Sequence, residues 1–260
     1  MKFARDYRYE AQNETRPQQG AFVVILLIYA LINAVINFSY QEQFVLFDQT
    51  INVVNKPLSF LSFLIGYHLI FSFTFIAKKV HFGNKISIKD LFVGFRDYVR
   101  ILVAHILEGL YLLLWEILFA LPGIIGFIVS FIFLGQNLLE QFVFAIIVSS
   151  ILTLVGSIFT IQKSYSYKMI DFILLENSNL SSREAISLSK ELMSGYRWRL
   201  FCLELSYIGW LFVCVLTLGI FALVVVPRQH QAKYLFFKDV YEENGYSINS
   251  LDDDIQVSYL

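Results

Sequence analysis

The sequence predicts an all-α protein, a polytopic transmembrane helical bundle with six spans and amphipathic cytoplasmic interfacial helices. Three observations support this fold class. Hydrophobic residues make up 57% of the 260 residues, and the mean hydropathy is +0.61. The apolar residues gather in runs long enough to cross about 30 Å of hydrocarbon. Of the 20 lysine and arginine residues, all except Lys56 fall in segments that a six-span arrangement places on one side.

The apolar runs cover residues 21–40, 57–77, 101–121, 142–162 and 200–226. The last run is the longest, and a Thr-Leu-Gly step at residues 217–219 predicts a turn inside it. Two antiparallel helices then replace one overlong helix, which gives six crossings. Outer loops are expected at residues 41–56, at residues 135–141 and in the short turn around Leu218.

Residues 124–134 follow a Pro-Gly step and are too short to cross a membrane alone, because a helix of this length covers about 17 Å. A crossing here would also move the basic residues of segment 163–199 to the outside. We therefore expect either a kinked continuation of the preceding helix or a re-entrant piece near the outer surface.

Basic residues concentrate in cytoplasmic loops of membrane proteins, which orients the chain. We expect a multi-pass protein of the bacterial cytoplasmic membrane with both termini in the cytoplasm. Its expected parts are a cytoplasmic segment at residues 1–20, a six-span membrane domain at residues 21–240 and an acidic cytoplasmic tail at residues 241–260. The polar first segment, followed by a long apolar run, predicts a retained signal anchor.

Two cytoplasmic stretches carry signals for the start of a helix. Ser87 is a candidate N-cap of the first stretch. Ser181 and Glu184 have capping-box spacing in the second, which is expected to end near Gly195. Each stretch gathers apolar residues on one helix face. That face either lies on the membrane surface or packs on the cytoplasmic ends of the spans, and the sequence leaves both alternatives open.

Ionisable side chains inside apolar runs cost about 2.5 to 3.5 kcal/mol each at mid-depth, so they face protein or water and are candidates for function. Five residues form the candidate buried polar site. They are Glu108, Glu116, Glu204, Arg228 and His230.

On a helix, His105 shares one face with Glu108 and Glu116. This arrangement is typical of a proton or cation relay, and the alternative is that His105 and Glu108 contact headgroups and water at the interface. Arg228 follows the final turn closely and is expected to pair with Glu204 or Glu116. The alternative is that the side chain of Arg228 forms no such pair and extends along the helix to the inner membrane interface.

The sequence lacks the metalloprotease, nucleophile-elbow and phosphate-loop motifs. We therefore expect no enzyme activity, no catalytic residue, no cofactor and no metal site. Cys202 and Cys214 lie about 18 Å apart on a straight helix, which is too far for a disulfide. Membrane lipids are the expected partners, together with other membrane proteins or a second copy of the chain, and nucleic acid is not expected.

Short motifs follow one another through the second half of the chain. They are FILLENSNL (172–180), EAI (184–186), LMSG (192–195), WRLF (198–201), LSYIGW (205–210) and LTLGI (216–220), with LPGII (121–125) upstream. The chain thereby resembles the bacterial family catalogued as domain of unknown function 975, although Ser178 stands where that family usually has proline. The resemblance implies a multi-span membrane protein distantly similar to membrane domains attached to some glycerophosphodiester phosphodiesterases. It implies no catalytic residues.

Together these features predict a non-enzymatic accessory or scaffold protein in envelope, lipid or membrane-active-peptide resistance functions. The alternative is a small transporter or channel that uses the buried carboxylates.

Overall fold

The computed structural model describes residues 1–38, 40–46, 49–55, 59–135 and 139–248. Its described helices are α1 (Ala4–Thr15), α2 (Gln19–Ile36), α3 (Ser59–His81), α4 (Tyr98–Gly135), α5 (Leu139–Ser164), α6 (Ile170–Glu176), α7 (Ser182–Leu192), α8 (Arg197–Leu205), α9 (Ile208–Leu216) and α10 (Ala222–Glu243). The 3-10 helix η1 (Arg16–Gln18) lies between α1 and α2, and the 3-10 helix η2 (Ile88–Phe95) lies between α3 and α4. The predicted helical fold class is confirmed.

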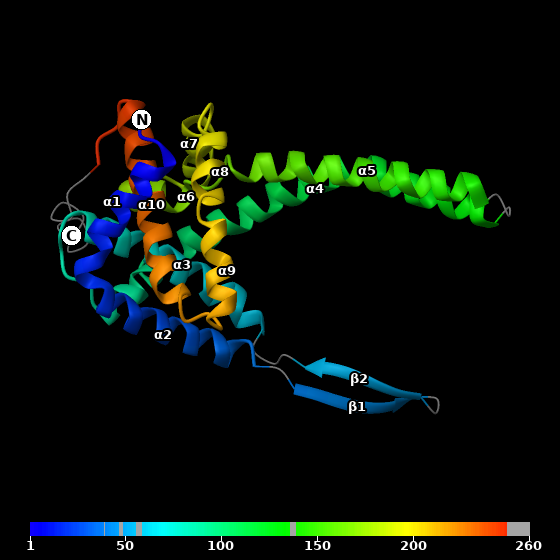
Figure 1. Ribbon diagram of the computed structural model, residues 1–260, viewed down its shortest axis with the longest axis horizontal. Helices are drawn as coiled ribbons and strands as arrows, with labels where there is room; N and C mark the ends of the chain where they lie inside the picture. The colour runs from blue at the N-terminus through cyan, green and yellow to red at the C-terminus, as the bar shows by residue number, and fades with distance from the viewer. Residues whose placement is uncertain (39, 47–48, 56–58, 136–138, 249–260) are drawn as a thin grey trace.

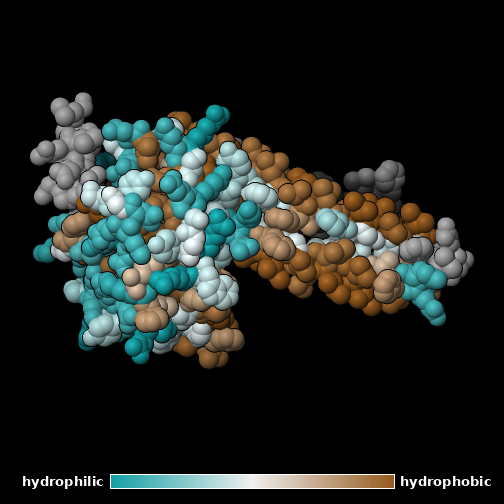
Figure 2. Space-filling model, turned by 90° about the horizontal axis from the view of Figure 1, so that it is seen from above, coloured by the Kyte–Doolittle hydropathy of each residue, from teal (hydrophilic) through white to brown (hydrophobic). Residues whose placement is uncertain are grey.

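A helical body and a long projecting hairpin make up most of the molecule (Figure 1). The body surrounds a core to which α1, α3, α6, α7, α8, α10 and the first turns of α4 contribute. The remainder of α4 packs antiparallel against α5 and leaves the body. We call residues 116–135 and 139–162 the arm. Apolar residues cover the arm, whereas hydrophilic residues gather on the body (Figure 2).

Four helical stretches in the described part of the chain are long and apolar enough to cross a membrane, by length and composition. They are Ala4–Ile36, Tyr98–Ile132, Leu139–Ser164 and Arg197–Leu216. The predicted count of six is not confirmed. The returning helix of the last hairpin is α10, which buries polar and aromatic residues such as Gln231 and Tyr234 inside the body.

Residues 124–134 continue α4, which runs unbroken through Pro122. Of the two alternatives left open by the sequence, the continuation is the one found. A helix of 38 residues is about 57 Å long, which exceeds the hydrocarbon thickness by a wide margin. This surplus length explains why α4 can belong to the body at one end and to the arm at the other.

Small residues allow α4 and α5 to approach closely along the arm. A Cβ atom at Gly156 would collide with the carbonyl oxygen of Phe119, and one at Gly126 would collide with the hydroxyl of Ser149. A small-residue face is a common means of close helix packing in membranes. The arm is therefore one packed unit.

A two-stranded antiparallel hairpin of β1 (Tyr40–Leu46) and β2 (Gln49–Asn55) connects α2 to α3, where the sequence predicted an outer loop. The structure agrees better with the other loops that the sequence predicted. The turn at residues 217–219 is present, because Leu218 and Gly219 adopt φ values of 50° and 87°. Residues 136–138 of the second expected loop, and residues 249–260 of the acidic tail, lie outside the described residues.

The two capped stretches are confirmed as helix starts, but they differ in kind. Ser181 and Glu184 form a reciprocal capping box at the start of α7, and Gly195 follows that helix at φ 86°. The apolar side chains of α7, Ala185 and Leu192 among them, are buried in the core of the body. The first stretch forms the 3-10 helix η2, which Ser87 caps.

The polar segment before the first apolar run also packs into the body. Tyr7 and Ala11 of α1 are buried, and the hydroxyl of Tyr7 donates a hydrogen bond of 2.7 Å to Asp239 of α10. The two ends of the described chain are thereby held together.

Candidate functional site

One cluster of ionisable residues joins α4 to α6 at the base of the arm. The Nδ1 atom of His105 lies 3.0 Å from a carboxylate oxygen of Glu108, and its Nε2 atom lies 3.0 Å from one of Asp171. The ring of Tyr67 stacks on this imidazole at 4.2 Å. An imidazolium carries one donor on each ring nitrogen, which matches a carboxylate on either side. Proton movement between the two carboxylates through the ring is the chemistry that this geometry permits.

Glu116 is not part of this cluster. Eight residues beyond Glu108, it lies about 12 Å further along the helix axis, where α4 enters the arm. Its side chain is exposed and forms no ion pair within the described ranges. His105, Glu108 and Glu116 therefore lie on one helix, α4, as predicted, but their three side chains do not form one site.

Glu204 has a partner different from the predicted one. Its carboxylate lies 2.7 Å from the ammonium of Lys233 and accepts a hydrogen bond of 2.6 Å from the hydroxyl of Tyr165. The predicted pair with Arg228 is wrong, because the prediction assumed that one unbroken helix leads from Glu204 to the turn at Leu218. The chain instead breaks between α8 and α9 at Ser206 and Tyr207, which brings Glu204 level with Lys233.

Arg228 and His230 lie on α10, in different surroundings. Arg228 lines a pocket with residues of α1 and α9. His230 stacks on Phe73 of α3 with ring centroids 5.4 Å apart. Burial, reinforced by the charge of Lys233, lowers the pKa of His230 to about 4, so the ring is neutral at neutral pH. The five predicted site residues thus occupy separate places in the body and the arm.

The sequence also failed to identify the most deeply buried ion pair of the body. The ammonium of Lys78 on α3 lies 3.0 Å from a carboxylate oxygen of Glu176 on α6, and the side chains are 0% and 1% exposed. In the sequence, Lys78 is only one of the basic residues that orient the chain. A usable signal existed, because Glu176 is the acidic residue of the FILLENSNL motif.

Arg100 holds the turn that follows Glu176. Its guanidinium donates to the carbonyl oxygens of Leu174, Asn177 and Ser178 at 2.7, 2.9 and 2.6 Å. These bonds satisfy the carbonyl of Leu174 in the last turn of α6 and two carbonyls of the turn beyond it, where Ser178 stands at the position at which the family usually has proline. In the described residues no group of three His, Cys, Asp or Glu side chains is placed to hold a metal ion.

Long apolar helices joined to a polar, internally paired body indicate a membrane protein. The chain belongs to the family described as protein of unknown function (DUF975), whose model matches residues 1–244. This agrees with the family that the motifs indicated. No curated protein and no solved structure matches the chain.

Proposed function

We propose that this chain is a non-enzymatic accessory or scaffold protein of the bacterial cytoplasmic membrane, acting in envelope, lipid or membrane-active-peptide resistance functions. The observation that carries the proposal is the combination of an apolar arm with a body in which the carboxylates of Glu176, Glu204 and Asp90 are paired with lysines. Such a molecule presents surfaces to lipid and to other membrane proteins.

The arm supports the membrane part of the proposal. Ile117 and Leu118 of α4 are 49% and 55% exposed, and Phe144 of α5 is 70% exposed. A helix pair that exposes large apolar side chains on many sides requires a hydrocarbon environment or a partner of the same kind. Lipids, another membrane protein or a second copy of the chain would cover these side chains.

The ion pairs support the non-enzymatic part. Glu176, Glu204 and Asp90 are each paired with a lysine, at 3.0, 2.7 and 2.9 Å. These contacts connect α3 to α6, α8 to α10 and α3 to η2. A carboxylate held in this way stabilises helix packing and is not poised as a free acid or base. We propose as well that the chain is distantly similar to membrane domains attached to some glycerophosphodiester phosphodiesterases, a relation that is compatible with an accessory role.

The distribution of basic residues supports a cytoplasmic location for both termini. Single-cysteine labelling in intact cells tests this topology after Cys202 and Cys214 have been replaced by alanine. Exposed Arg183 on α7 provides an inside position, and exposed Leu139 at the tip of the arm provides an outside position. An impermeant reagent should modify Leu139→Cys and not Arg183→Cys. The reverse pattern would overturn the orientation.

Complementation of a deletion strain tests the accessory role. The deletion should change the sensitivity of cells to membrane-active peptides or their lipid profile, and the parent gene should restore it. A Gly156→Leu variant, which disrupts the packing of the arm, should not restore it, whereas Gly109→Leu should, because open space surrounds Gly109. A deletion strain with unchanged sensitivity and lipid profile would refute the proposal.

One observation favours the alternative of a small transporter. His105 lies between two carboxylates and can exchange a proton with either one. Proteoliposome flux measurements with Glu108→Gln and Asp171→Asn test this alternative against Glu243→Gln, an exposed control at the end of α10. Flux that both site variants abolish and the control preserves would favour the transporter. Absence of flux for the parent protein favours the accessory role.

A further inference from the structure

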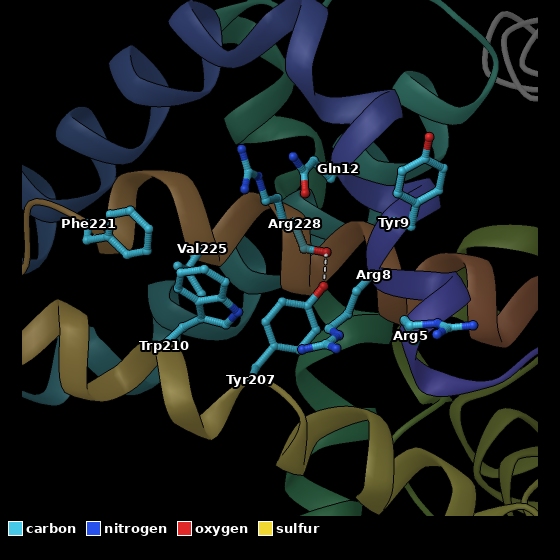
Figure 3. A pocket seen from close by; sticks show the side chains of 9 residues that line it. All are labelled: Arg5, Arg8, Tyr9, Gln12, Tyr207, Trp210, Phe221, Val225 and Arg228. Carbon is cyan, nitrogen blue, oxygen red and sulfur yellow. Dashed lines mark hydrogen bonds between the residues drawn. The ribbon is translucent and has the colours of Figure 1, made fainter.

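A cavity of about 250 Å³ lies between α1, the corner that joins α8 to α9, and α10 (Figure 3). Its lining changes in character from one end to the other. Arginine side chains from α1 and α10 occupy one end, and aromatic and aliphatic side chains from α9 and α10 occupy the other. None of the interactions described for the ion pairs of the body involves this cavity.

The cationic end has more positive charge than its neighbours neutralise. Arg8 donates to the carbonyl of Ser206 at 3.0 Å, and its Nε atom is buried without a hydrogen-bond partner. Arg228 forms no ion pair with any residue in the described part of the chain, whereas Arg5 lies 3.9 Å from the carboxylate of Asp6. A buried donor without an acceptor is unfavourable, and an anion at this end would supply the missing acceptor.

The opposite end is aromatic and leads to an apolar tip. The rings of Trp210 and Phe221 stack with centroids 5.4 Å apart, and Val225 follows on the next turn of α10. At the tip of the same hairpin, Leu216 and Leu218 are 83% and 94% exposed. The cavity therefore runs from its arginine end toward a surface that requires hydrocarbon.

The wall between the two ends is fixed by one hydrogen bond. The hydroxyl of Tyr207 donates to the backbone carbonyl of Arg228 at 3.2 Å (Figure 3). This bond ties the α8–α9 corner to α10, and the bond from Arg8 to the carbonyl of Ser206 ties α1 to the same corner. The site is thus built from three elements that the body already holds in place.

We infer that this cavity binds the phosphate-bearing headgroup of an anionic phospholipid. The phosphate binds at the arginine end of the cavity, and an acyl chain passes over Trp210, Phe221 and Val225. A planar guanidinium presents two donors to phosphate oxygens, which makes a cavity end lined by arginines a suitable phosphate site. A free phosphate compound shares the polar part of this chemistry but cannot use the aromatic end. The inference goes beyond the accessory role and does not depend on it.

The first experiment measures lipid binding by the purified full-length protein in detergent. Fluorescent phosphatidylglycerol should bind at least ten times more tightly than fluorescent phosphatidylcholine. The double variant Arg8→Gln, Arg228→Gln should lose at least tenfold in affinity for phosphatidylglycerol. The matched control is Arg16→Gln, Arg183→Gln, which removes the same charge at exposed positions outside the cavity and should bind like the parent.

The deacylated headgroup of phosphatidylglycerol distinguishes a lipid from a free phosphate compound. It should compete only at a concentration at least a hundredfold higher than the lipid. Equal competition by the two would overturn the assignment to a lipid. Equal loss of affinity in the double variant and its control would overturn the site, because the binding would then reflect net charge alone.

A second measurement does not depend on the stability of the arginine variants. With Trp115 and Trp198 replaced by phenylalanine, Trp210 is the remaining tryptophan. In nanodiscs of phosphatidylcholine, a small fraction of phosphatidylglycerol with brominated chains should quench Trp210 at least twice as strongly as the same fraction of brominated phosphatidylcholine. Equal quenching would contradict the inference. A negative result in both measurements would leave the complementation test of the accessory role unaffected.

Discussion

The buried pair of Lys78 and Glu176 permits a quantitative test of how the body is held together. The pair joins α3 to α6 at 3.0 Å, and neither side chain is more than 1% exposed. Lys78→Met leaves the carboxylate of Glu176 buried without that partner, which costs about 3 to 5 kcal/mol. Replacing both residues, as Lys78→Met with Glu176→Leu, removes both charges and should cost far less or even stabilise the protein.

Thermal unfolding of the purified protein in detergent measures this difference. For a chain of this size, 1 kcal/mol corresponds to a shift of about 2 to 4 °C in the melting temperature, so Lys78→Met should lower it by about 6 to 20 °C. The double variant should melt above either single variant. Lys2→Met is the control, because its pair with Glu10 is 42% and 35% exposed and contributes about 1 kcal/mol or less.

Two results would refute this reasoning. If Lys78→Met melts within about 2 °C of the parent, the ion pair does not stabilise the packing of α3 against α6. If the double variant melts below both single variants, the side chains act through packing and not through their charges.

Three further predictions follow from other contacts. Gly156→Leu should separate α4 from α5 at Phe119 and destabilise the arm by about 1 to 3 kcal/mol, measured as a fall in melting temperature. Glu204→Gln weakens the bond to its lysine partner and should cost about 1 to 3 kcal/mol in the same assay. Because the pKa of His230 falls from 6.5 to about 4 on folding, the stability it contributes is complete above pH 6.5 and declines as the pH falls toward 4. The melting temperature of the parent should therefore fall more steeply over this interval than that of His230→Phe.

Each of these has an outcome that would contradict it. A Gly156→Leu protein as stable as a Gly109→Leu protein would mean that the arm is loosely packed. An unchanged melting temperature for Glu204→Gln would place Glu204 among solvated side chains. Parallel pH profiles for the parent and His230→Phe would show that the ring is not shielded from water.

The sequence by itself determined the features that depend only on residues close together in the chain. The apolar runs predicted α2, α4 and α5, because a helix that crosses the hydrocarbon needs about 20 consecutive apolar residues. The capping box at Ser181 and the turn at Gly219 depend on hydrogen bonds and backbone angles within a few residues. The close approach of α5 to α4 at Gly156 was found only in the structure.

Only the tertiary structure decided which charges meet. Asp171 approaches His105 because α6 packs beside α4, and nothing within either segment specifies that contact. Glu204 reaches Lys233 because the chain breaks between α8 and α9, where residue counting assumed a straight helix. An ion pair depends on the separation of two side chains from distant segments, and that separation is set by the packing of the helices that carry them. The sequence therefore determined which stretches are apolar and helical, whereas the packing of the body determined the polar site.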